Sequence, residues 1–182
     1  CNKRDMYEQY NVKEFLAYRI YNLLTEYSFR VRPLMVEYRE DAGRGSFSRF
    51  GFLIEDVDDV AKRNGLKKLA VPKISYKTLD PVETSKLGLF QFMIGNTEYS
   101  FVNPEPGESC CHNADLLSVG GGPPYIAVPF DFDFSGLVEA PYAQPNPTPR
   151  PRSPPGNPRP TGSRNRAGTP VPPAGERLPP PR

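Results

Sequence analysis

An abrupt change of composition after residue 143 limits which part of this chain can fold. Residues 144–182 carry 14 of the 23 prolines and seven arginines, against one glutamate and no aromatic residue. Such a segment cannot bury enough apolar surface to offset the entropy of ordering its backbone. We therefore expect a disordered, Pro/Arg-rich C-terminal tail with polyproline II character over 144–182 and a single folded domain over 1–143.

The tail also accounts for the positive charge of the chain. It carries +6 of a chain whose net charge is +2, which leaves −4 on residues 1–143. The folded part is therefore acidic, and we expect no nucleic-acid partner. The tail itself fits a ligand for aromatic proline-binding grooves, a weak electrostatic anchor, or a tail without a role of its own.

Cysteine usage and hydropathy indicate the compartment. The three cysteines, of which Cys110 and Cys111 are adjacent, form neither a CxxC metal pair nor a secreted disulfide framework. We find no signal-peptide pattern and no apolar run of about 18 residues, so we expect a cytoplasmic protein without a transmembrane segment. Because the first residue is Cys1 rather than Met, we also expect sequence upstream of it.

Apolar spacing and capping residues predict three helices. The first spans residues 11–27, and Asp80-Pro81 begins another that Gly95 ends. Acidic residues from Glu55 cap a short helix that runs to Asn64-Gly65. The residues expected to face the core are Leu16, Ile20, Leu23, Leu24 and Tyr27 in the first helix and Val82, Leu89, Phe90, Met93 and Ile94 in the helix after Asp80.

Period-2 alternation predicts the strands. Residues 34–38 and 50–54 form a hairpin across a polar loop that contains Gly43 and Gly45, and 112–117 contains a short strand. The glycine triplet Gly120–Gly122 makes a turn, because it lacks the lysine and the spacing of a phosphate-binding loop. A buried strand follows over 125–134, so the fold class is α+β.

Asp131 and Asp133 alternate with three phenylalanines, at 130, 132 and 134. In an extended strand both carboxylates would lie on one face and the rings on the other. Two carboxylates suit Mg²⁺ or Mn²⁺ and leave room for phosphate oxygens. The alternative is an ordinary half-buried strand with a solvated face.

Three other chemistries are weaker. Cys110 or Cys111 beside His112 could form a nucleophile–base pair, although adjacent residues seldom point at each other. Glu98 with Asp131 or Asp133 could act on a glycosidic bond. A metal-dependent hydrolase could use the two aspartates with His112.

The order of elements and motifs resembles the spore coat protein H (CotH) kinase-like family of bacteria. Four motifs carry the resemblance over roughly residues 7 to 143: Leu16–Arg19 (LAYR), Gly51–Glu55 (GFLIE), Gly95–Glu98 (GNTE) and Asp131–Asp133 (DFD). The resemblance implies a partial atypical protein-kinase-like fold that binds ATP and Mg²⁺. It also implies a phosphotransferase whose acceptor, possibly a protein, is unknown.

The resemblance assigns the catalytic and metal-binding roles by position. Glu98 falls where these kinases place a catalytic aspartate, and Asn103 or Asn113 falls where they place a metal-binding asparagine. Asp131 or Asp133 matches the metal aspartate that bridges Mg²⁺ to the β- and γ-phosphates.

Two further positions concern the nucleotide. Glu14 matches the helix glutamate that pairs with the nucleotide lysine in kinases. The backbone from Glu55 through Asp56 to Val57 matches the hinge that binds adenine.

Three departures from the family pattern make us expect an inactive fragment. Glu98 is longer than aspartate by a methylene, and a misplacement of roughly 1 Å can lower a rate ~100-fold. The glycine-rich loop and the nucleotide lysine are missing and are expected upstream of Cys1. The tail after Ala143 stands where helices should continue, either as a genuine tail or as the product of a frame shift. The alternative function is a non-catalytic, pseudokinase-like binding module.

Overall fold

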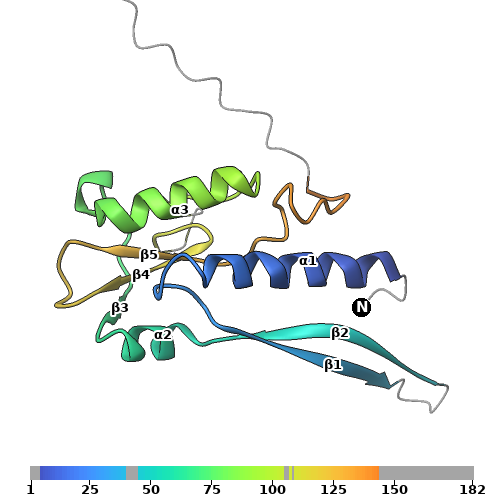
Figure 1. Ribbon diagram of the computed structural model, residues 1–182. Coiled ribbons are helices and arrows are strands. Elements are labelled where there is room, and N and C mark those ends of the chain that lie inside the picture. Colours follow the sequence, from blue (N-terminus) through green and yellow to red (C-terminus); the bar gives the residue numbers. More distant parts are fainter. Residues whose placement is uncertain (1–4, 40–44, 105–106, 108, 144–182) are drawn as a thin grey trace, which may run out of the picture. The chain divides into compact units, whose positions relative to one another are not determined.

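The computed structural model describes residues 5–39, 45–104, 107, 109 to 143, and within these ranges the fold is a mixture of helices and small antiparallel sheets (Figure 1). The described elements are three α-helices, one 3₁₀ helix and five strands, arranged in one two-stranded and one three-stranded sheet. The expected α+β class is confirmed at this level. The predicted tail lies outside the described residues.

The first helix packs on a long hairpin. Helix α1 spans Asp5–Tyr21, and strands β1 (Val31–Arg39) and β2 (Ser46–Ile54) pair from Val31↔Ile54 to Arg39↔Ser46. The ring of Phe15 on α1 lies 5.7 Å from Phe50 and 5.8 Å from Phe52. The predicted hairpin is therefore confirmed, while most of its loop, including Gly43, lies outside the described residues.

The second sheet lies beneath α3 in the view of Figure 1. Helix α2 (Val57–Arg63) leads to β3 (Lys67–Leu69), and the 3₁₀ helix η1 (Tyr76–Thr78) leads to α3 (Pro81–Met93). Strand β4 (Ala114–Ser118) lies between β3 and β5 (Ile126–Pro129). The glycine triplet connects β4 to β5, as its reading as a turn predicted.

Four aromatic residues from distant parts of the sequence form the centre of the core. Tyr18 lies 4.7 Å from Phe132, Tyr21 lies 4.7 Å from Phe90, and Phe90 lies 5.5 Å from Phe132. All four side chains are almost fully buried. This cluster joins α1 and α3 to the segment that follows β5.

The predicted helix caps are confirmed. The side chain of Asp56 accepts a hydrogen bond from Asp58 N–H, and Gly65 takes a φ of +67° just after α2. Asp80 accepts from the N–H groups of Val82 and Glu83, with Pro81 in the first turn. These short polar side chains satisfy backbone groups that have no partner within the helix.

The bounds and the buried face predicted for the first helix were wrong. The helix covers 5–21 rather than 11–27, and it buries Ala17, Tyr18 and Tyr21. The expected stripe is largely exposed, because the aromatic core selects the neighbouring face of a helix that is apolar on more than one side. The exposed members are Leu16, Ile20, Leu23 and Leu24.

Two further expectations need correction. Leu87, Phe90 and Gln91 are buried on α3, with Ile94 just beyond it, whereas the expected core residues Val82, Leu89 and Met93 are exposed. Lys67 and Lys68, for which local sequence indicates a basic loop rather than a strand, lie in β3 and pair with β4. Pairing with a buried strand overrides a weak local preference.

Candidate functional site

The chain leaves the sheet before it reaches the two aspartates. Strand β5 ends at Pro129, Asp131 has a φ of +60°, and Ser135 N–H donates to Phe132 O at 3.0 Å in a turn. The expected strand over 125–134, with both carboxylates on one face, is therefore wrong. The turn arises because Phe132 enters the aromatic core. Even so, the carboxyl groups of Asp131 and Asp133 are close enough to share a hydrogen bond.

A buried tyrosine holds the backbone of Asp131. The hydroxyl of Tyr18 accepts a hydrogen bond from Asp131 N–H at 2.9 Å, and its ring packs on Phe132. A positive φ is unfavourable for a residue with a side chain and persists only where contacts fix it. Tyr18 supplies such a contact from α1.

Glu14 joins the two aspartates from α1, and we call these three residues the carboxylate cluster. Burial, together with the negative charges of Asp133 and Asp131, raises the pKa of Glu14 to about 7, although a hydrogen bond with the Phe132 backbone acts in the opposite direction. Burial also raises the pKa of Asp131 to about 6, together with the charge and hydrogen bond of Asp133 and the charge of Glu98. Asp131 is nevertheless exposed, so solutes can reach it.

The loop that holds Glu98 is attached to the same region. Asn96 Oδ1 accepts from Glu98 N–H at 3.0 Å, and Asn113 Nδ2 donates to Glu98 O at 2.9 Å. Asn113 O in turn accepts from Phe130 N–H at 3.1 Å, directly before Asp131. Asn113 thus links Glu98, the predicted catalytic residue, to the segment that contains Asp131, a predicted metal ligand.

Two glycines allow these segments to approach closely. Gly136 N–H donates to Gly95 O at 3.2 Å, and Leu137 N–H donates to Ile94 O at 3.0 Å. A Cβ atom on Gly136 would lie 3.4 Å from Ile94 O, and Gly95 has a φ of +65°. The GNTE loop and the segment that follows the DFD motif are therefore hydrogen-bonded neighbours.

Asn103 lies with Glu98 in a polar pocket of about 340 Å³. The pocket is also lined by His112, whose positive charge lowers the pKa of Asp131 against the effects that raise it. Asn103 is anchored through its backbone, since Asn103 N–H donates to Ser100 Oγ and Asn103 O accepts from His112 N–H. Of the two asparagines predicted, Asn113 contacts the Glu98 backbone and Asn103 borders the pocket.

The residues of the predicted hinge line a different pocket, of about 320 Å³. Glu55, Asp56 and Val57 form one side, and Phe130 and Asp115 are on its lining as well. Glu55 N–H already donates to Arg30 O, and the Glu55 carboxylate binds Arg63. Asp56 O also accepts from Asp59 N–H and Val60 N–H at 3.1 Å, so a hinge contact to a nucleotide would need other backbone groups of this segment.

The groups that the resemblance implies are Mg²⁺ and ATP. The described residues contain no set of three or more His, Cys, Asp or Glu side chains placed to hold a metal ion. Mg²⁺ usually takes only one or two protein carboxylates and completes its shell with phosphate and water. Asp131 and Asp133, close enough to share a hydrogen bond, fit that requirement. Asn113 O accepts from Phe130 N–H, one residue before Asp131.

The size of the hinge pocket also fits part of a nucleotide, since small-molecule pockets begin at about 300 Å³. In the described part of the chain, Nδ2 of Asn96 and both amide atoms of Gln91 are buried without a hydrogen-bond partner. Asn96 belongs to the same loop as Glu98. Buried amides of this kind usually bind water or a ligand group.

Two tyrosines of the site were missed from sequence. Tyr18 was quoted only as part of the LAYR motif, and Tyr142 was not considered. Burial raises the pKa of Tyr142, as do the charge of Asp133 and a hydrogen bond with it. A tyrosine on the buried face of a helix needs a partner for its hydroxyl, and this signal could have pointed to Tyr18.

Comparison with protein-family models, curated proteins and solved structures found no match for this chain. Among the described residues, no helix has the length and apolar character required to cross a membrane.

Proposed function

We propose that this chain is the core of a Mg²⁺- and ATP-dependent phosphotransferase with a partial atypical kinase fold of the CotH kinase-like type. The observation that carries the proposal is the convergence of the Glu98 loop and the Asp131–Asp133 turn through Asn113. Phosphoryl transfer depends mainly on positioning and charge stabilisation, which such a convergence could supply.

Each part of the site has a role in this proposal. Asp131 and Asp133 would hold Mg²⁺, with Asn113 beside them, and the metal when bound would neutralise charge on the phosphates. The pocket beside Glu55, Asp56 and Val57 would take the adenine ring. Phe130 lines that pocket and directly precedes Asp131, so the two sites are adjacent along the chain.

Glu98 and Asn103 would receive the acceptor. Their pocket is polar and also contains His112. Glu98 would orient an acceptor hydroxyl or remove its proton, which requires the carboxylate to lie within hydrogen-bond reach. The acceptor itself is not specified by this pocket.

Glu14 supports the proposal independently. In the described part of the chain no cationic side chain offsets its charge, and burial raises its pKa to about 7. A partly buried carboxylate beside two others gains most from a cation. The nucleotide lysine of a kinase-like fold is the partner that the resemblance implies.

Calorimetric titration with ATP in the presence of Mg²⁺ tests the proposal. The double variant Asp131→Asn plus Asp133→Asn should bind at least about tenfold more weakly, equivalent to ~1.4 kcal/mol. The control pair Asp5→Asn plus Glu37→Gln removes the same charge from exposed positions and should bind normally. Equal affinity in all three proteins would refute the proposal.

A pseudokinase-like binding module is the second candidate, favoured by the glutamate at position 98. Asn96 binds the Glu98 N–H and Asn113 binds the Glu98 carbonyl oxygen, so the backbone at this position is held in place. A shift of the loop therefore cannot compensate for the extra methylene of the glutamate side chain. A phosphate-transfer assay on Glu98→Asp separates the two candidates. Raised turnover indicates a damaged enzyme, whereas nucleotide binding without turnover in either form indicates a binding module.

A further inference from the structure

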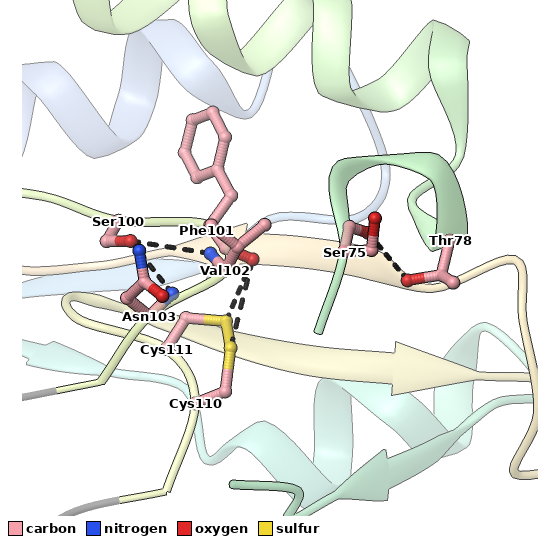
Figure 2. The surroundings of a disulfide bond; sticks show 8 residues. All are labelled: Ser75, Thr78, Ser100, Phe101, Val102, Asn103, Cys110 and Cys111. Atoms are coloured by element: carbon pink, nitrogen blue, oxygen red, sulfur yellow. Dashed lines mark hydrogen bonds between the residues drawn. A yellow bond between two sulfur atoms is a disulfide. The ribbon is translucent and has the colours of Figure 1, made fainter. Parts of the chain in front are cut away.

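Cys110 and Cys111 form a disulfide at the edge of the irregular segment between α3 and β4 (Figure 2). Both residues are buried, with 5% and 8% of their surfaces exposed. Isolated bridges hold the surrounding backbone, namely Val71↔Cys110 and Ser100↔His112. The N–H groups of Cys110 and Cys111 donate to Val71 O at 2.7 Å and to Ala114 O at 3.2 Å. Exchange of the buried pair with a dissolved thiol or disulfide therefore requires a local opening that breaks these bonds.

Both sulfur atoms face one carbonyl oxygen. Cys110 Sγ lies 3.8 Å from Phe101 O, and Cys111 Sγ lies 2.9 Å from it, as Figure 2 shows. In the disulfide neither sulfur carries a hydrogen, whereas in the dithiol each sulfur becomes a weak donor. Phe101 O can therefore accept a hydrogen bond from a thiol in the reduced state but not from the disulfide in the oxidised state.

The cysteine pair is connected directly to the loop that holds Glu98. His112, the next residue, accepts from Ser100 N–H at 3.0 Å and donates to Asn103 O at 3.2 Å. Asn113 then donates to Glu98 O at 2.9 Å. A shift of the backbone at Cys111 would therefore also move His112 and Asn113, which are bonded to Ser100, Asn103 and Glu98 of the polar pocket.

We propose that Cys110–Cys111 is a reversible dithiol–disulfide centre that sets the order of the loop over residues 97–103. The disulfide restrains the backbone at 110–111 and with it the hydrogen bonds of His112 and Asn113. Reduction removes this restraint and loosens the loop. The centre acts on loop order, so it does not depend on the phosphotransferase proposal.

The exchange partner is a small-molecule disulfide such as oxidised glutathione. One cysteine thiolate attacks it, forms a mixed disulfide and releases the first glutathione thiolate. The second cysteine thiolate attacks the protein sulfur of that mixed disulfide and releases the second glutathione. The two cysteines lose two protons and two electrons, and the glutathione disulfide becomes two thiols.

Hydrogen exchange followed by mass spectrometry tests the centre in a Cys1→Ser background, where only the pair can titrate. Alkylation of free thiols across a series of glutathione ratios reports its redox state. We expect amide exchange over residues 98–113 to rise several-fold on reduction, while exchange in α2 stays constant. The matched variant Cys110→Ser plus Cys111→Ser should not respond to redox conditions.

Two results would overturn the inference. One is a pair that stays fully reduced even in oxidised glutathione without reductant. The other is identical exchange over residues 98–113 in the oxidised and reduced protein. Nucleotide affinity is measured separately, so its loss or retention bears on the proposed function and leaves this outcome unaffected.

Discussion

Asp131 is held by a tyrosine 113 residues earlier in the chain. Asp131 and Asp133 lie close together, as the alternating motif predicts, but they follow β5 instead of forming part of a strand. The alternation with phenylalanine is equally compatible with a turn in which one ring enters the core. Because that turn depends on Tyr18 and Phe90, no local pattern could have revealed it.

The Tyr18→Phe variant tests this contact. It keeps the ring that packs on Phe132 but leaves the Asp131 N–H without its acceptor. We expect the free energy of unfolding to fall by about 1 kcal/mol, the usual effect of losing one partly buried hydrogen bond. Denaturant unfolding measures this, with Tyr76→Phe, which changes a 63% exposed residue, as a control that should show little effect. An equally stable Tyr18→Phe protein would show that the hydroxyl does not position Asp131.

Glu14 gives the protein a pH-dependent stability. Its pKa in the folded state, about 7, lies above the ordinary value of 4.5, so the folded state binds more protons between these pH values. The contribution of Glu14 to the free energy of unfolding is therefore complete below pH 4.5 and is lost as the pH rises through about 7. Stability should therefore decrease across this window.

Glu14→Gln should remove the part of this dependence that comes from Glu14, while Asp131, whose pKa is also raised, keeps its own part. We expect the variant to gain up to about 2 kcal/mol over the parent at pH 8, after allowance for partial exposure, and almost nothing at pH 4. Denaturant unfolding at the two pH values gives the difference. Glu37→Gln, at a carboxylate whose pKa a hydrogen bond from Arg39 lowers, should show no such gain. An equal effect of Glu14→Gln at both pH values would contradict the raised pKa.

At the level of elements, local capping signals were more reliable than apolar stripes. Asp80-Pro81 and Gly95 bounded α3 correctly because each acts through its own backbone or side chain. The buried faces of α1 and α3 depend on partners that are distant in sequence. Where apolar residues cover more than one face of a helix, spacing alone cannot choose between them.

The cap of α3 allows a direct test at this scale. Asp80 Oδ1 accepts from Val82 N–H at 3.0 Å and from Glu83 N–H at 2.9 Å. Asp80→Ala should lower the free energy of unfolding by about 1 kcal/mol, whereas Asp80→Asn, which keeps a capping oxygen, should stay close to the parent. Thermal unfolding of the two variants compares them. If both variants lose the same stability, the charge of Asp80 matters rather than its cap.

At the scale of the whole molecule, the sequence predicted the mixed α and β class, the hairpin and the caps of α2 and α3. It missed β3, whose backbone pairs with β4 although two of its three residues are lysines. The chain pairs α1 with the hairpin and α3 with the second sheet, and the aromatic core joins them. Phe132 of the DFD turn packs on Tyr18 of α1, and this contact brings Asp131 and Asp133 close to Glu14 on the same helix.

We propose that Asp131 and Asp133 hold one cation, with Glu14 close to them and Asn113 bonded through its backbone to Phe130, which precedes Asp131. Titration with Mn²⁺ in the presence of ATP, followed by paramagnetic broadening of amide signals, tests it most directly, because Mn²⁺ shares the oxygen preference of Mg²⁺. We expect the signals of these four residues to broaden first, before those of exposed Asp58 and Asp59 on α2. Broadening that begins at Asp58 and Asp59, or that is uniform over all acidic residues, would contradict the account.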